Sequence, residues 1–195
     1  MFNSRNIVLD CVYDLRSRVR DIFRRDFEGL FNRVSHGLDE TGVKHLLMEM
    51  YNDGYIEFFR GQKKVQLKEK ISAIEIDPQW FFSLTEKGGQ LWENIYQPNW
   101  DLYIGIDSEL PTNDDAVETI TIRAGSLKAL QDLLEKIRNE STYEEISPLK
   151  PLTAWRPTYW KSLDRGCTVT LLGGKEFSED LVLYISCLHW RKFLS

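Results

Sequence analysis

The chain has 195 residues, of which 42% are hydrophobic and 28% are charged, a composition typical of globular proteins that bury a core of their own. Its formal net charge of −5 argues against a general polyanion binder, because negative charge repels phosphate at long range. The 3 cysteines are widely spaced and odd in number, which argues against a disulfide framework and favours a reducing cytoplasm. Asp10 and Asp14 interrupt the N-terminal apolar pattern, and no apolar run is long enough to span a membrane. We therefore expect a cytoplasmic protein with no signal peptide and no membrane contact.

Helical patterns dominate the first quarter of the chain. Apolar residues recur every three or four positions from Ser4 to about Arg25, and again from Phe27 to Val34. Asp39 suits the N-cap of a third helix, because its carboxylate can accept from free backbone N–H groups of the next turn. This helix is expected to end near Asn52, since Gly54 can adopt the left-handed conformation that ends helices.

Strand patterns follow the third helix. Tyr55–Arg60, Ile71–Ile76 and Trp80–Leu84 are rich in aromatic and β-branched residues, and a hydrophilic stretch separates the first from the second. Thr85 then suits the N-cap of a fourth helix that ends before Pro98. The expected order is helix, helix, helix, strand, hydrophilic loop, strand and helix.

Two segments carry a resemblance to a known family. They are "LLMEMYNDGYIEF" and "FFSLTEKGGQLWE", and they resemble the L-x-x-L-x-x-x-G-Y-I and Y-x-L-T-x-x-G segments of winged-helix regulators of the MarR and PadR type. The resemblance covers about residues 4–97 and implies a winged-helix domain over residues 1–98. It further implies a homodimer that places the third helix in the major groove of DNA, with the hydrophilic loop as the wing.

The second half, residues 99–195, resembles no family that we recognise and is expected to form a smaller α+β domain. Asp101–Ile106, Val117–Ala124, Cys167–Gly174 and Leu181–Trp190 have strand patterns. Ser126 suits the N-cap of an amphipathic helix whose apolar face is formed by Leu127, Leu130, Leu134 and Ile137. Residues 139–152 have the composition of a linker, and residues 158–163 are expected to form a helical turn or two. The fold class of the whole chain is therefore α+β.

The resemblance assigns candidate DNA contacts to the third helix and the wing. On the helix they are Lys44, His45 and Asn52, and in the wing they are Arg60, Lys63, Lys64 and Lys68. Reading bases requires bidentate donors, and gripping phosphates requires several cations, so this helix offers few of either. The alternatives are a solvated helix face and a hairpin edge on which lysines discourage aggregation.

Two further groups of residues are candidate contacts for a protein partner. Arg16, Arg20 and Arg24 recur at i, i+4 and i+8, so on one helix they would form a column. This column could grip phosphates, or it could meet an acidic face of the second half or of a partner subunit, and the protein contact is favoured because arginine is enriched in interfaces. The second group, in "AWRPTYWK", is Trp155, Arg156, Tyr159 and Trp160. These aromatic and cationic side chains could stack on a ligand, or they could anchor a long connection onto the core.

No motif predicts catalysis. Cys167, Cys187 and His189 lack a fourth ligand for zinc, and Gly173–Gly174 suits a hairpin turn better than a phosphate loop. We therefore expect a non-catalytic binding protein without a metal or cofactor. One hypothesis is a transcriptional regulator that binds DNA, and the other is a protein-interaction module, such as an adaptor or a toxin-neutralising partner, that keeps the winged-helix shape.

Overall fold

The computed structural model describes residues 4–13, 16–23, 37–67, 79–109, 119–140, 144–145 and 147–172, and these form an α+β structure with two antiparallel sheets. The chain divides into two compact units. Unit 1 comprises Met1–Gln97 and Thr158–Lys161, and unit 2 comprises Pro98–Pro157 and Ser162–Ser195. No helix in the described part of the chain is long and apolar enough to cross a membrane.

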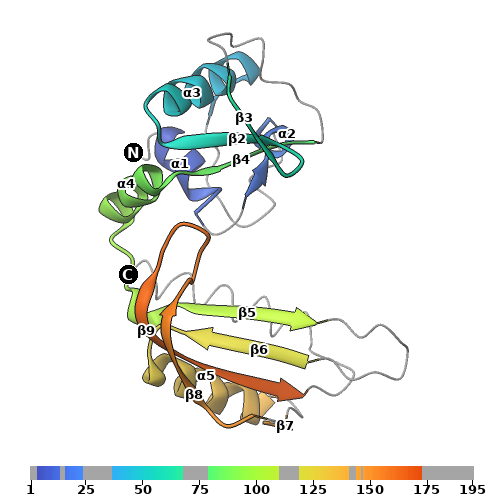
Figure 1. Ribbon diagram of the computed structural model, residues 1–195, viewed down its shortest axis with the longest axis vertical. Helices are drawn as coiled ribbons and strands as arrows, with labels where there is room; N and C mark the ends of the chain where they lie inside the picture. The colour runs from blue at the N-terminus through green and yellow to red at the C-terminus, as the bar shows by residue number, and fades with distance from the viewer. Residues whose placement is uncertain are drawn as a thin grey trace, which may run out of the picture. The chain divides into compact units, whose positions relative to one another are not determined.

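Unit 1 combines four described helices with one sheet (Figure 1). The helices are α1 (Ser4–Asp10), α2 (Val19–Ile22), α3 (Glu40–Asn52) and α4 (Glu86–Tyr96). The strands are β1 (Ser17–Arg18), β2 (Ile56–Arg60), β3 (Lys63–Val65) and β4 (Trp80–Leu84). All pairs are antiparallel, and the strand order in the sheet is β1-β4-β2-β3.

Helix α3 confirms the expected third helix at both of its ends. The Asp39 carboxylate accepts from the backbone N–H of Gly42 at 2.7 Å, as an N-cap does. Gly54, just beyond the helix, has φ 73°, a left-handed conformation that suits glycine. Met48 of this helix is only 5% exposed and belongs to the core.

The expected first helix, from Ser4 to about Arg25, is wrong. Helix α1 ends at Asp10, and Ser17 pairs with Phe82 so that β1 forms an edge of the sheet before α2 begins at Val19. The pairing satisfies backbone groups at the edge of β4, and this long-range hydrogen bonding outweighs the local helical pattern. The expected helix at 27–34 and strand at 71–76 lie outside the described residues.

Helix α4 begins where the sequence predicts, and two consecutive glycines let it pack closely. Thr85 Oγ1 accepts from the Gly88 N–H at 3.1 Å and caps the helix. A Cβ on Gly88 would lie 2.0 Å from the carbonyl oxygen of Tyr55, so only glycine allows this approach of helix and strand. Below these glycines, the fully buried Trp92 stacks on Tyr13 with ring centroids 4.6 Å apart.

Unit 2 is a sheet with a helix on one face. The strands are β5 (Ile104–Glu109), β6 (Thr119–Ala124), β7 (Glu144–Glu145), β8 (Lys150–Trp155) and β9 (Leu163–Leu172), and a short 3-10 helix (Trp100–Leu102) precedes them. The order is β5-β6-β9-β7, and β8 also pairs with β9. Helix α5 (Leu127–Glu140) lies against one face of this sheet (Figure 1).

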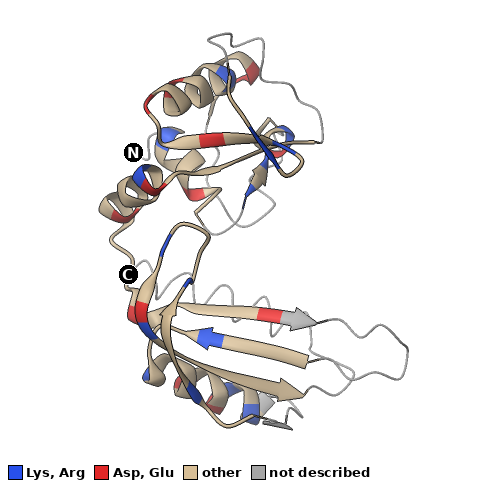
Figure 2. Cartoon of the chain, in the orientation of Figure 1, with Lys and Arg blue, Asp and Glu red and all other residues tan. Residues whose placement is uncertain are grey.

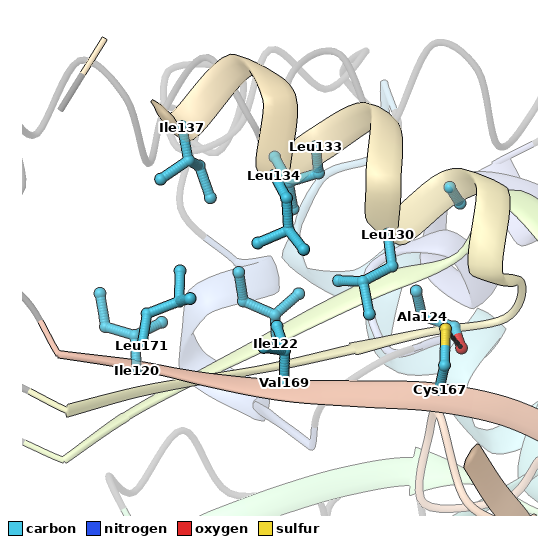
Figure 3. Packing of buried hydrophobic residues seen from close by; sticks show 11 residues of the cluster. Ile120, Ile122, Ala124, Leu130, Leu133, Leu134, Ile137, Cys167, Val169 and Leu171 are labelled. Carbon is cyan, nitrogen blue, oxygen red and sulfur yellow. Dashed lines mark hydrogen bonds between the residues drawn. The ribbon is translucent and has the colours of Figure 1, made fainter. Parts of the chain in front are cut away.

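The core of unit 2 lies between α5 and the sheet. Figure 3 shows Leu130, Leu134 and Ile137 pointing from the helix toward the aliphatic side chains of β6 and β9. Leu127 was expected on this face, but it is 49% exposed, and Leu133, only 5% exposed, is buried instead. Leu127 occupies the first position of the helix, at the margin of the buried stripe, where its side chain leaves the sheet.

Two expectations for the second half are also wrong. Residues 139–152 are not a linker, because they contain β7 and the start of β8, which both pair with β9. Residues 158–161 form no helical turn but lie in the connection from β8 to β9, and they belong to unit 1. Pro151 is tolerated in β8 because this strand has a described partner on one side only. The expected strand at 181–190 lies outside the described residues.

Candidate functional site

The exposed side of α3 carries more carboxylates than cations. Lys44 forms an ion pair with Glu40 at 2.8 Å, within one turn of the helix. Arg5 of α1 contacts the carboxylates of Glu49 and Asp53. Lys87 of α4 also lies near the end of this helix, where its Nζ donates to the Asp53 carbonyl oxygen at 2.7 Å, so the described residues give this surface no excess of positive charge.

The other expected DNA contacts on α3 are His45 and Asn52, and both are exposed. His45 Nδ1 donates to the carbonyl oxygen of Thr41 at 2.8 Å, so one ring nitrogen is held by the helix itself. The helix thus offers one amide and one imidazole nitrogen beside the paired Lys44. Such a surface has little capacity for bidentate base contacts.

The expected wing begins with a tight turn at Gly61, which has φ 58° and joins β2 to β3. Arg60 and Lys63 are exposed register partners and therefore lie on one face of the hairpin. Lys64 points to the opposite face, where it forms an ion pair with Glu57. The wing cations are thus divided between two faces, and Lys68 lies outside the described residues.

The arginine column expected on the first helix does not form. Arg16 precedes β1, Arg20 lies in α2 with its Nε 3.4 Å from a carboxylate oxygen of Asp21, and Arg24 lies outside the described residues. A spacing of four residues places side chains on one face of a continuous helix, and this alignment is lost where a strand interrupts the helix. Arg16 and Arg18 instead follow the period of a strand and share one side of β1.

The sheet of unit 1 has a buried face and an opposite face. Along β2 and β4, alternate side chains point into the core, and these are Ile56, Phe58, Trp80, Phe82 and Leu84. The opposite face, called the outer sheet face below, is formed by Arg16, Arg18, Glu57, Phe59, Lys64, Phe81 and Ser83. Figure 2 shows the basic segments of β1 and of the β2–β3 hairpin in blue.

Arginine side chains cover the aromatic rings of the outer sheet face. Phe59 and Phe81 are register partners on β2 and β4. The guanidinium carbon of Arg16 lies 3.7 Å from the centre of the Phe59 ring, and that of Arg18 lies 5.8 Å from the centre of the Phe81 ring. Both distances lie within the range of cation–π attraction. Arg18, Phe59 and Phe81 are not among the candidate residues from the sequence, because they become neighbours only when β1, β2 and β4 pair.

The "AWRPTYWK" segment is divided between the two units. Trp155, in unit 2, is 8% exposed and donates from its indole nitrogen to the carbonyl oxygen of Arg165 at 2.8 Å, and Arg156 beside it is exposed. In unit 1, Tyr159 contacts two backbone groups, and Trp160 Nε1 donates to the carbonyl oxygen of Tyr13 at 2.6 Å. The polar atoms of these three rings are thus bonded to the backbone, which favours anchoring over ligand binding.

A metal or redox role has no support among the described residues, which contain no group of three His, Cys, Asp or Glu arranged to hold a metal ion. Cys167 is 4% exposed within the core of unit 2, and burial raises the pKa of its thiol above the ordinary value of 9.0. A thiol in this state is a packing residue, because the thiolate is the form that binds metals and attacks electrophiles. Cys187 and His189 lie outside the described residues.

Comparison with known proteins gives no relative. No family model matches the chain, and no curated protein and no solved structure matches it.

Proposed function

We propose that unit 1 is a winged-helix domain. Its sheet order supports this, since β1 pairs with β4 and β4 pairs with β2, and α3 directly precedes β2. The local motifs that resemble winged-helix regulators fall on α3, β2, β4 and α4, and they supply the caps and turns of those elements. In this proposal α3 is the helix that would face DNA in a regulator.

The function we propose for this domain is the binding of a protein partner, without catalysis and without DNA as its main ligand. The observation that carries the proposal is the charge of the exposed side of α3. Among the described residues, Glu40, Glu49 and Asp53 lie beside Lys44 and Arg5, which are both paired, and Lys87 Nζ donates to the Asp53 carbonyl oxygen at 2.7 Å, so this side of α3 has no excess of positive charge. A net positive charge strongly favours the entry of a helix into a DNA groove, because the helix must approach negatively charged phosphates.

A DNA-binding regulator remains the second candidate, and one observation favours it. Lys63 and Arg60 are exposed together on one face of the β2–β3 hairpin, where a wing would meet the phosphate backbone. In this alternative the hairpin provides affinity, and His45 and Asn52 of α3 provide the contacts to bases.

The two candidates differ in how duplex DNA binding depends on salt. The experiment is fluorescence anisotropy with a labelled duplex of mixed sequence, titrated with the full chain over a series of salt concentrations. A protein-binding module should show no binding at physiological salt, whereas a regulator should bind with an affinity that falls steeply as salt rises. Binding of the second kind would overturn the proposal.

A matched pair of variants tests the role of α3 in the same assay. Glu40→Gln with Glu49→Gln removes two carboxylates from the exposed side of α3, and Asp132→Asn with Glu135→Gln removes two exposed carboxylates from α5. The protein-interaction proposal predicts no gain in DNA affinity for either variant. A gain confined to the α3 variant would show that this helix approaches phosphates.

A further inference from the structure

We propose that the outer sheet face docks an extended, carboxylate-rich segment of a partner protein, held by Arg16 and Arg18. The proposal rests on the proposed function in one respect, that the ligand is a protein. The proposed contact does not involve α3, the helix through which a regulator would bind DNA. It lies on the face of the unit 1 sheet that points away from the core.

The geometry of the two arginines leaves their hydrogen-bond donors available. A guanidinium group that stacks on a ring uses its flat face, so its N–H groups still point outward in the plane of the group. Arg16 and Arg18 are both exposed, and among the described residues neither guanidinium has a carboxylate partner. The Phe59 ring, 3.7 Å from the Arg16 guanidinium carbon, restrains this group, which lowers the entropy cost of binding.

Lys64 is the third cation named on the outer sheet face, and it differs from Arg16 and Arg18 because its charge is already balanced. Lys64, on the same face, forms an ion pair with Glu57, whose other carboxylate oxygen lies 3.5 Å from the hydroxyl of Ser83. Among the described residues of the outer sheet face, the charge without an ion-pair partner therefore belongs to Arg16 and Arg18. This local excess of positive charge complements carboxylates.

The spacing of the two arginines favours an extended ligand. Alternate residues of an extended peptide are roughly 7 Å apart and share one face. Arg16 and Arg18 also occupy alternate positions, and both of their guanidinium groups lie over rings of the outer sheet face. A segment with acidic residues at alternate positions can therefore place one carboxylate on each guanidinium. Arginine pairs bidentately with carboxylates, which makes such contacts stronger than simple charge attraction.

A single-stranded nucleic acid fits this surface less well. Binding of single strands depends on bases that stack on open aromatic rings. Phe59 is only 5% exposed, and the Arg16 guanidinium already covers its ring. The surface thus offers charge with little stacking area, which suits carboxylates better than bases.

The test uses the full chain and defined probes in fluorescence anisotropy at low and physiological salt. The main probe is a labelled peptide of alternating glutamate and leucine. The comparison probes are a peptide of the same composition with its glutamates in adjacent pairs, a peptide of alternating lysine and leucine, and a single-stranded oligonucleotide.

Variants with matched charge separate local contact from long-range attraction. Arg16→Glu with Arg18→Glu reverses both charges of the pair, and Lys128→Glu with Arg165→Glu makes the same change at exposed sites of unit 2. Arg16→Gln with Arg18→Gln is a milder version in case charge reversal disturbs folding. Thermal unfolding of each variant checks that the fold is kept.

We expect the wild-type chain and the unit 2 variant to bind the alternating glutamate peptide with similar Kd. Either change at Arg16 and Arg18 should raise this Kd by about tenfold or more, since two charge-assisted contacts are lost. Adjacent glutamates should bind more weakly than alternating ones. No binding by the wild type, equal loss in the unit 2 variant, or tighter binding of the oligonucleotide through the same arginines would each overturn the proposal.

The result is independent of the test of the proposed function. Duplex DNA binding that depends on Lys63 and α3 would overturn the proposed function, and peptide binding at the outer sheet face would still stand. Conversely, failure of the peptide to bind would remove this docking surface without making the chain a DNA-binding protein.

Discussion

Gly89 illustrates how one residue connects sequence to packing. It lies within α4, where glycine is less favourable than alanine by about 1 kcal/mol. A Cβ at this position would lie 2.1 Å from a ring carbon of Trp160. The glycine therefore has a packing role, because it lets a residue from the distant β8–β9 connection lie directly against the helix.

We predict that Gly89→Ala destabilises the chain, although alanine is the better helix former. Overpacking of this kind lowers the free energy of unfolding by about 1–3 kcal/mol, and unfolding in denaturant measures this loss. Gln90→Ala, at an exposed position of the same helix, is the control and should be neutral or slightly stabilising.

A double-mutant cycle identifies the cause of this loss. In a Trp160→Ala background the clash is absent, so Gly89→Ala should no longer be destabilising. The same destabilisation with and without the Trp160 ring would contradict the explanation.

Some of these single residues could be predicted from the sequence, and others could not. Asp39 and Thr85 were predicted as helix caps because a cap depends on a backbone group only a few residues away. The stacking of Arg16 on Phe59 was not predicted, because it joins residues that become neighbours only when the sheet forms. The candidate DNA contacts were placed by family resemblance, and the carboxylates that pair with Lys44 and Lys64 are visible only in the structure.

At the scale of elements, the connection between β8 and β9 holds unit 1 together. The Tyr159 hydroxyl donates to the carbonyl oxygen of Val12 and accepts from the N–H of Leu84 at 2.6 Å. It thus joins the turn after α1 to the end of β4. Lys161, two residues further on, forms an ion pair with Glu93 of α4.

We predict that Tyr159→Phe lowers the free energy of unfolding by about 1–3 kcal/mol, because it leaves two backbone groups without their partner. Amide exchange at Leu84 should accelerate, and NMR can measure it directly. Tyr55→Phe removes a hydroxyl from a partly exposed ring and serves as the control. Equal stability and unchanged exchange at Leu84 would show that the Tyr159 hydroxyl contributes nothing.

Elements with a strong local pattern were the ones that the sequence predicted best. Helices α3 and α5 have caps and apolar stripes, and strand β4 has the bounds expected for it. The failures involve competition between local and distant partners. Residues 4–25 have a helical stripe, yet part of this stretch pairs with β4, and no local pattern reports that a sheet edge is available.

At the scale of the whole molecule, the units do not follow the halves of the sequence. Unit 1 takes Met1–Gln97 and then four residues from beyond Pro157. The sequence predicts a domain boundary at residue 98 because composition and motifs change there. No change of composition or motif indicates that Thr158–Lys161 belong to unit 1. A domain cut at residue 98 lacks side chains that pack on Trp92.

We predict that a fragment of residues 1–98 is less stable than unit 1 within the full chain. Without Trp160 the ring of Trp92 loses one of its aromatic neighbours, whose centroid lies 6.1 Å away. The fragment should therefore melt at a lower temperature than the full chain. Equal melting temperatures would mean that the first segment alone completes the unit.

The discontinuity of unit 1 also has a consequence for protein synthesis. The 60 residues from Pro98 to Pro157 must be translated before Thr158–Lys161 can reach the sites around Tyr13 and Leu84. At roughly 5–20 residues per second, the emerging unit waits on the order of several seconds with its core incomplete. During that interval Trp92 lacks its contact with the Trp160 ring, so we expect the nascent chain to be most exposed to chaperones and aggregation while unit 2 is still being made.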